Sequence, residues 1–188
     1  MLSDTETQNH LNLADELSEL SVSQDSFTAL NNQVGSTPSG GTLTLNKDYV
    51  YSNGDTKTGI VINKDLTIDG KGHTLNGAGK ASIFKIQGNY KVTLKNINFI
   101  NAYGNNGPAL QLSADNTVNI INSKFINNIA LVNGGAIDIS SSSKITSSIT
   151  ITNSLFENNK ASNGGAISAK GTLLNVVDSK FNNNNALG

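Results

Sequence analysis

The chain has 188 residues, no cysteine and a formal net charge of −1. This length suits one domain with a continuous core, and the lack of cysteine excludes disulfides and thiolate metal sites. The balanced charge argues against a nucleic-acid partner, and no apolar run is long enough to span a membrane.

The N-terminal quarter predicts a tail, a helix and a linker. Residues 1–24 are acidic and polar and predict a flexible or partly helical tail without the apolar stretch of a signal peptide. In 25–34, Asp25 or Ser26 can cap a helix whose Phe27, Leu30 and Val34 recur at helical spacing. We expect this amphipathic helix to cover the open N-terminal end of a core. Residues 35–41, with one proline and three glycines, form a linker.

Residues 42–188 contain internal repeats. Four similar segments begin at Val92, Val118, Ile149 and Leu174, roughly 25–31 residues apart, and weaker copies begin at Thr42 and Leu66. Their apolar residues alternate with period two, as in strands with one buried face. The pattern predicts an all-β fold, a right-handed parallel β-helix of about six coils, with three strands in each coil and an incomplete last coil. A β-sandwich or a leucine-rich repeat does not account for this order of residues.

The inward positions follow from the alternation. The first strands carry pairs such as Leu43 and Leu45, or Leu66 and Ile68, and the third strands carry pairs such as Leu110 and Leu112. In the second strands we expect one stacked aromatic column, formed by Phe99, Phe125, Phe156 and Phe181.

Asparagine and glycine recur at the predicted turns. We expect stacked asparagines to form amide ladders and paired glycines to supply positive φ angles or close backbone approaches before the third strand. One asparagine column is Asn96, Asn122 and Asn153, and the other is Asn101, Asn127, Asn158 and Asn183. The glycine pairs are Gly134-Gly135 and Gly164-Gly165.

These motifs carry a family resemblance over about residues 26–188. The segments FINN, FENN and FNNN alternate with GGAI, which resembles the FxxN and GGAI repeats of polymorphic outer-membrane autotransporters. The fuller pattern, with SFTALNNQV, INKDLTIDGKGHTLNG and VTLKNINFINA, is similar to the adhesin-like proteins of methanogenic archaea. The resemblance implies a secreted, surface-anchored β-helix that mediates attachment. Because residues 1–20 lack a signal sequence, we expect the export signal and the anchor to be absent from this chain.

Catalysis is not expected, although this pectin-lyase-like fold also carries polysaccharide lyases, pectin esterases and polygalacturonases. The chain has no arginine, and Asp138 has no second carboxylate in its outward column, whose other members are Val61, Lys85, Gln111 and Ser168. The serine-rich insertion at 140–147 contains no residue of a catalytic type except Lys144. His73 is interpreted as a turn residue bonded to backbone. The aspartates match no calcium loop and are interpreted as turn residues, with a weak structural calcium site as the alternative; we expect no cofactor and no metal.

The outward column of the first strands is the possible binding face. It is either an ordinary solvated sheet face or a surface for a glycan or protein of another cell, and it comprises Thr44, Thr67, Thr93, Asn119, Thr150 and Asn175. Tyr90 and Tyr103 lie in predicted turns and are the candidate exposed aromatics. The sequence favours a non-catalytic cell-surface adhesin. The alternatives are a carbohydrate-active enzyme and a structural subunit that self-associates end to end through its open C-terminal coil.

Overall fold

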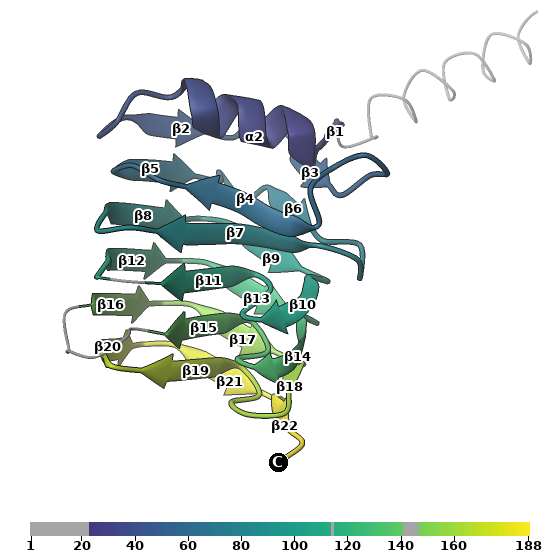
Figure 1. Cartoon of the computed structure of the whole chain (residues 1–188), viewed down its shortest axis with the longest axis vertical. Coiled ribbons are helices and arrows are strands. Elements are labelled where there is room, and N and C mark those ends of the chain that lie inside the picture. The colour runs from purple at the N-terminus through teal and green to yellow at the C-terminus, as the bar shows by residue number, and fades with distance from the viewer. Residues whose placement is uncertain (1–22, 114, 141–146) are drawn as a thin grey trace, which may run out of the picture.

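The computed structural model describes residues 23–113, 115–140 and 147–188, so nearly all of the predicted tail and most of the serine-rich insertion lie outside it. The chain forms a parallel β-solenoid of about six turns with one helix near its N-terminus (Figure 1). The predicted parallel β-helix is therefore confirmed. Its strands form four sheets, numbered 1 to 4 below, where the sequence predicted three.

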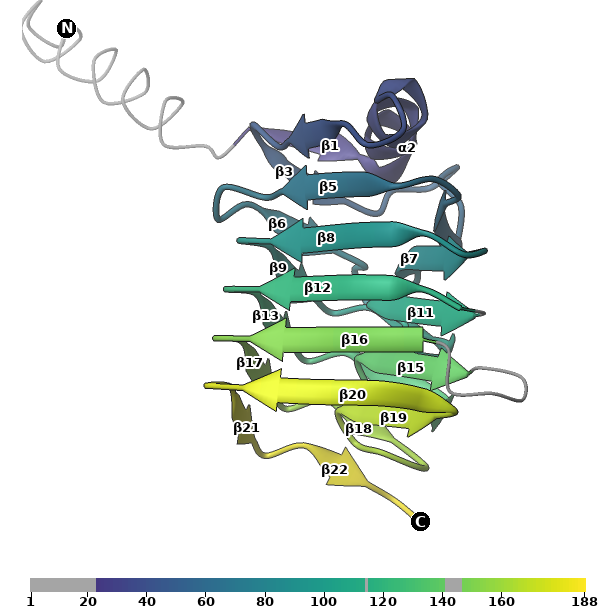
Figure 2. The same ribbon diagram turned by 90° about the vertical axis from the view of Figure 1, so that its left-hand side faces the viewer.

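Sheet 1 contains the first strand of every coil, and its strands lie one above another along the solenoid axis (Figure 2). Equivalent apolar residues pair directly, so Val92 aligns with Val118 and Val118 with Ile149. Its strands are β2 (Thr42–Thr44), β5 (Leu66–Asp69), β8 (Lys91–Lys95), β12 (Thr117–Ile121), β16 (Ser147–Thr152) and β20 (Thr172–Val177).

Sheet 2 follows after a tight turn and carries the aromatic column. The rings of Phe99, Phe125, Phe156 and Phe181 are stacked nearly parallel, with neighbouring centroids 4.7 Å apart. This separation matches the strand spacing of a β-sheet, which confirms the predicted stack. The strands are β1 (Gln24–Ser26), β3 (Asp48–Val50), β6 (Thr74–Asn76), β9 (Asn98–Ile100), β13 (Lys124–Ile126), β17 (Leu155–Glu157) and β21 (Lys180–Asn182).

Sheet 3 closes the coil with the third predicted strand. Leu110 aligns with Phe84 on one side and with Ile137 on the other, so the predicted inward positions are paired. Its strands are β4 (Thr58–Ile62), β7 (Ser82–Gln87), β11 (Leu110–Ser113), β15 (Ile137–Ser140) and β19 (Ile167–Lys170).

Sheet 4 was not predicted. It lies between the sheet 2 and sheet 3 strands of the later coils and consists of short strands with little apolar alternation. Its strands are β10 (Tyr103–Asn106), β14 (Ile129–Asn133), β18 (Lys160–Ala161) and β22 (Asn185–Ala186).

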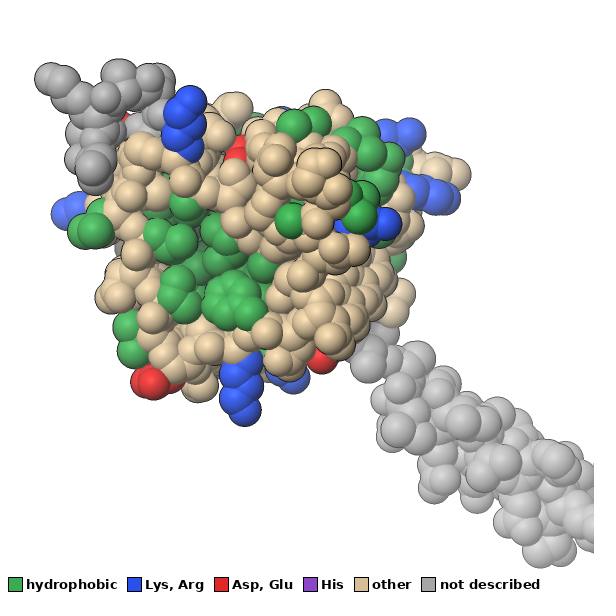
Figure 3. All heavy atoms as spheres, turned by 90° about the horizontal axis from the view of Figure 1, so that it is seen from below, with side chains coloured by type: hydrophobic (Ala, Val, Ile, Leu, Met, Phe, Trp, Pro, Cys, Tyr) green, Lys and Arg blue, Asp and Glu red, His purple; other side chains and the backbone are tan. Residues whose placement is uncertain are grey.

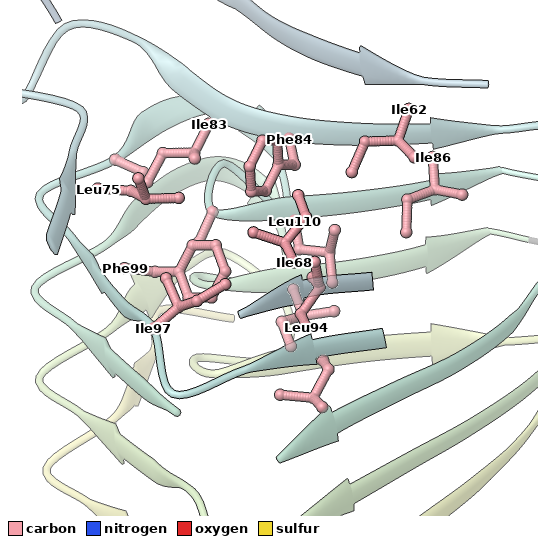
Figure 4. Packing of buried hydrophobic residues seen from close by; sticks show 14 of the residues in the cluster. Ile62, Ile68, Leu75, Ile83, Phe84, Ile86, Leu94, Ile97, Phe99 and Leu110 are labelled. Carbon is pink, nitrogen blue, oxygen red and sulfur yellow. The ribbon is translucent and has the colours of Figure 1, made fainter. Parts of the chain in front are cut away.

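The core is continuous along the solenoid. Figure 4 shows Leu75, Ile83, Phe84 and Phe99 packed together between the sheets, with Ile97 beside Phe99. The Phe84 ring meets the Phe99 ring edge-on, with centroids 6.1 Å apart. Burial of these side chains is the main stabilising contribution to the fold.

The helix α2 (Phe27–Ser36) covers the N-terminal end, close to the predicted 25–34 (Figure 1). Phe27, Leu30 and Val34 are buried against the first coils. Ser26 is the N-cap, and its hydroxyl accepts a hydrogen bond from the Ala29 amide at 3.2 Å. Because α2 covers this end, the core is shielded from water there.

In the first coil the observed strand register differs from the predicted one. Thr42 aligns with Thr67, and Leu43 aligns with Ile68, so the expectation that Thr44 continues the outward column is wrong. Thr44 instead aligns with Asp69. The physical reason lies just before β2, where the Gly40 amide donates to the Asp65 carbonyl at 2.7 Å and the Thr67 amide donates to the Gly41 carbonyl at 3.0 Å. A Cβ on Gly41 would lie 2.9 Å from the Pro38 carbonyl oxygen, so a larger residue does not fit there.

Candidate functional site

The predicted polar column on sheet 1 exists from the second coil onward. Thr67, Thr93, Asn119, Thr150 and Asn175 are aligned in register. Asn119 and Asn175 are exposed and the threonines are half-buried. The column is a flat row of short polar groups with Thr42 at its N-terminal end, and its role as a binding face stays a prediction.

The first asparagine column forms the predicted ladder. The Asn153 amide donates to Asn122 Oδ1 at 2.7 Å, and the Asn122 amide donates to Asn96 Oδ1 at 3.4 Å. Asn96 in turn donates to Asp69 Oδ1 at 2.9 Å. All three asparagines have φ between 48° and 56°, a region that asparagine tolerates better than most residues. The column therefore shapes the turn between sheets 1 and 2.

The second asparagine column is only partly as predicted. Asn101, Asn127, Asn158 and Asn183 all have φ between 50° and 57°, so they form the turn after sheet 2. Of these four side chains, only Asn101 makes an inter-coil amide bond within the described residues, to Asn76 Oδ1 at 3.3 Å.

The continuous ladder lies one residue later, at Asn128, Asn159 and Asn184. The Asn128 amide donates to Asn159 Oδ1 at 2.9 Å and to the Phe99 carbonyl at 3.2 Å, while its own Oδ1 accepts from the Ala102 amide. Asn128 and Asn159 are fully buried. Sequence reasoning missed this ladder, although the second asparagine of each FxNN segment was its signal.

The glycine pairs have the predicted roles. Gly134 and Gly164 have φ of +58° and +65°. A Cβ on Gly135 would lie 2.0 Å from the Gly165 carbonyl oxygen, and a Cβ on Gly165 would lie 2.5 Å from the carbonyl carbon of Asn185. The turns before sheet 3 therefore stack too closely for any side chain.

Several aspartates have structural partners. Asp48 Oδ1 lies 3.0 Å from His73 Nδ1, so the interpretation of the His73 side chain as bonded to backbone is wrong. Burial raises the pKa of Asp69, but hydrogen bonds from Asn96, Lys71 and Lys95 outweigh this effect and lower that pKa to about 2. Asp69 also forms ion pairs of 3.3 Å with both lysines.

Asp138 has a different environment. It aligns with Gln111 and Ser168 as predicted, yet it is only 3% exposed. The turn at Gly107 lies directly on it, since a Cβ there would be 2.9 Å from Asp138 Cβ. Burial raises the pKa of Asp138, and hydrogen bonds from Ser140 and Ser168 only partly oppose this. Asp138 is thus a covered carboxylate.

A polar groove of about 350 Å³ lies between sheets 3 and 4. It runs over the outer side of β4, β7 and β11, and β10 forms its other wall. Its lining residues include three lysines, five amide or hydroxyl side chains and one tyrosine, and none of them is a carboxylate. They are Lys57, Thr58, Lys80, Ser82, Lys85, Tyr103, Gly104, Asn105, Asn106 and Gln111.

A second groove of about 630 Å³ lies at the adjoining corner and shares Tyr103 with the first. Asn76, Asn101 and Asn127 line it in successive coils, together with the exposed Ile129. Tyr103 is 39% exposed and stands between the two grooves. The molecule therefore offers a polar, donor-rich surface around one exposed aromatic ring.

Within the described residues no group of histidine and acidic side chains could hold a metal ion, and no helix is long and apolar enough to cross a membrane. The arrangement defines a parallel β-solenoid protein with surface grooves. No protein-family model matches the chain, no curated protein matches it, and no solved structure matches it.

Proposed function

We propose that this protein is a non-catalytic, adhesin-like scaffold of an extracellular cell surface, which attaches to glycans or proteins of another cell. The observation that carries the proposal is the groove between sheets 3 and 4. Its lining combines lysines, amides and one exposed tyrosine without a carboxylate. Such a surface can bind a polar ligand, but it lacks the paired acids of a glycosidase.

The scaffold supports this proposal through its rigidity. Sheet hydrogen bonds join each coil to the next, and stacked rings and the asparagine ladder add further bonds between the later coils. A surface that is ordered before binding loses little entropy when a ligand binds. Individually weak contacts then give firm attachment when many copies act on one cell surface.

The aspartates support binding over catalysis. Asp48, Asp55 and Asp69 accept hydrogen bonds from turns and helix ends, and Asp138 is covered by a turn. A carboxylate that holds the fold together is poorly placed to transfer protons to a sugar in a groove.

Binding and turnover assays test the proposal. We expect the purified chain to bind a glycan array or whole cells, and to release no new reducing ends or unsaturated products from acidic polysaccharides. Product formation that scales with protein concentration would favour the carbohydrate-active enzyme. Lack of binding to every glycan and cell type would contradict the adhesin proposal.

A self-assembling structural subunit is the second candidate, and it rests on the apolar side chains that the last coil of the 188-residue chain leaves exposed. Figure 3 views the molecule from the side of this coil and shows a cluster of hydrophobic side chains surrounded mostly by backbone and other side chains. Phe181 is 45% exposed, whereas Phe156 above it is fully buried, and Val176 is also exposed. Unpaired strands with apolar side chains recruit other strands.

A further inference from the structure

The groove between sheets 3 and 4 is held in shape by close backbone contacts. A Cβ on Gly104 would lie 2.5 Å from Ser82 Oγ, so this glycine allows β10 to pack directly on the start of β7. The Tyr103 amide donates to the Ala81 carbonyl at 3.0 Å, and the Ser82 amide donates to the Lys57 carbonyl at 2.9 Å. Three successive coils thus fix the walls of one groove.

The lysine side chains of the groove are unpaired. Lys57, Lys80 and Lys85 form no ion pair or side-chain hydrogen bond with any described residue. Lys85 is half-buried, and its stem lies along Gly59, where a Cβ would be 3.3 Å from Lys85 Cγ. Gly59 has φ of +96°, which favours glycine, and its lack of a Cβ leaves room for this stem. Three positive charges therefore converge without a protein anion.

Among the described residues, the nearby carboxylates form no ion pair with these lysines. Asp55, two residues from Lys57, accepts hydrogen bonds from the Phe27 and Thr28 amides at 3.1 and 2.8 Å. Asp138 follows Gln111 in the outward column but lies under the Gly107 turn. The lining itself contains three lysines and no carboxylate, and such a concentration of positive charge attracts anions.

The other lining groups suit a sugar. Asn106 Oδ1 accepts from the Asn133 backbone and side-chain amides, both at 3.2 Å, which fixes the orientation of the Asn106 side chain. Asn105 and Gln111 make no side-chain hydrogen bond with described residues, so their amides are available to hydroxyl groups. The partly exposed Tyr103 ring offers a flat apolar surface to the C–H face of a pyranose.

We infer that this groove binds an acidic oligosaccharide, with its carboxylate or sulfate groups on Lys57, Lys80 and Lys85 and a sugar ring on Tyr103. The inference rests on the proposed attachment function and specifies its ligand class. A volume of about 350 Å³ is at the lower end of ligand sites, so a short stretch of a longer glycan fits it.

Isothermal titration calorimetry of the full chain tests the inference with four probes. These are an oligogalacturonate hexamer, a sulfated heparin hexasaccharide, neutral maltohexaose and inorganic polyphosphate. We expect one of the two acidic sugars to bind at least about tenfold more tightly than maltohexaose, with an affinity that falls as salt rises. The uronate and sulfate arms show which acid group the lysines prefer.

Matched variants locate the binding. Lys57→Gln, Lys80→Gln and Lys85→Gln combined should weaken the acidic sugar about tenfold or more. The control combines Lys124→Gln, Lys160→Gln and Lys180→Gln, which removes the same charge from exposed positions outside the groove and should leave affinity nearly unchanged. Tyr103→Ala should weaken binding, whereas Tyr103→Phe keeps the ring and should retain it.

The outcomes separate the two proposals. Equal weakening by the groove and control variants, or polyphosphate binding as tightly as the sugars without dependence on Tyr103, would overturn the groove inference. Attachment to cells or neutral glycans that is unchanged in the groove variants would also overturn it, yet leave the attachment function standing. Acidic-sugar binding through the groove without any attachment to cells would support the inference and contradict the function.

Discussion

At the scale of single residues, two adjacent asparagines in the fourth coil have different physical roles. Asn127 is exposed with φ of +57°, while Asn128 is fully buried and bonds to Ala102, Phe99 and Asn159. Asn128→Ala leaves buried polar groups without partners and should lower the free energy of unfolding by about 2–4 kcal/mol. Asn127→Gly keeps the backbone conformation and should change the free energy of unfolding by about 0.5 kcal/mol or less. Urea unfolding measures both, and equal losses would contradict the assignment of the ladder.

The buried carboxyl group of Asp138 should make the stability of the fold depend on pH. Its pKa is raised by burial, so the folded chain holds this proton more tightly than the unfolded chain. Burying the charged carboxylate of Asp138 destabilises the fold. This destabilisation is absent below the pKa of Asp138 in the unfolded chain and fully present above its pKa in the folded chain. Asp138→Asn keeps the volume and an acceptor for Ser140, and it should raise the melting temperature at pH 7 but not at pH 3. A lower melting temperature of the variant at pH 7 would show that the charged form is needed.

At the scale of elements, α2 depends on Asp55. Burial raises the pKa of Asp55, but hydrogen bonds from the Thr28 hydroxyl and from the Ser52, Thr28 and Phe27 amides lower it to about 2. The hydrogen bonds to the Asp55 carboxylate therefore stabilise the fold above its unfolded pKa of 3.8, and this stabilisation is lost as pH falls through about 2. Asp55→Asn should lower the free energy of unfolding by about 1–2 kcal/mol at pH 7 and by much less at pH 2. Asp178→Asn is the control, because the same position in other coils is asparagine, and it should have little effect at either pH.

Along the phenylalanine column, the loss of stability on replacing a ring by alanine should decrease towards the open end of the solenoid. Phe125 is fully buried between Phe99 and Phe156, whereas Phe181 is 45% exposed at the open end. Phe125→Ala should lower the free energy of unfolding by about 3–5 kcal/mol, and Phe181→Ala by about 1 kcal/mol or less. Chemical denaturation of both variants provides the comparison. A loss well below about 1 kcal/mol for Phe125→Ala would be inconsistent with a tightly packed column.

How far these elements were predictable depends on the strength of their local pattern. Sheets 1 to 3 followed from period-two apolar pairs such as Val118 and Ile120, and the helix from Phe27, Leu30 and Val34. Sheet 4 was missed because strands such as Lys160–Ala161 are too short to show alternation. Thr44 was misplaced because a slip of two residues keeps the same face inward, and the apolar pattern does not show the backbone hydrogen bonds that hold Gly40 and Gly41 to the next coil.

The candidate groove was beyond sequence reasoning for a related reason. Lys57, Lys80 and Lys85 come from two coils that the pairing of β4 with β7 brings together, and the opposite wall depends on the close packing of Gly104 against Ser82. Tyr103 was identified as a possible exposed aromatic, and the structure adds that it stands beside these lysines. Asp138 was placed in the correct column, but its burial under the Gly107 turn depends on a contact between distant segments.

At the scale of the whole molecule, the two ends differ, and this limits how copies can associate. The helix α2 blocks the N-terminal end, with Phe27 and Leu30 fully buried, so head-to-tail stacking into an open filament is prevented. The C-terminal end exposes inward-type residues such as Val176 and Phe181. We therefore expect the 188-residue chain to form tail-to-tail dimers and no larger polymer as its concentration rises.

Sedimentation velocity over a wide concentration range measures this association. Val176→Lys with Phe181→Lys places charges on the exposed end and should leave a monomer at every concentration. Ile129→Lys with Leu131→Lys makes the same change on exposed residues of sheet 4 and should not affect the dimer. A parent chain that stays monomeric would remove the self-assembling subunit as a candidate, whereas polymers beyond the dimer would show that α2 leaves its end during assembly. Dimers that persist in the Val176 and Phe181 variant would place the contact elsewhere on the solenoid.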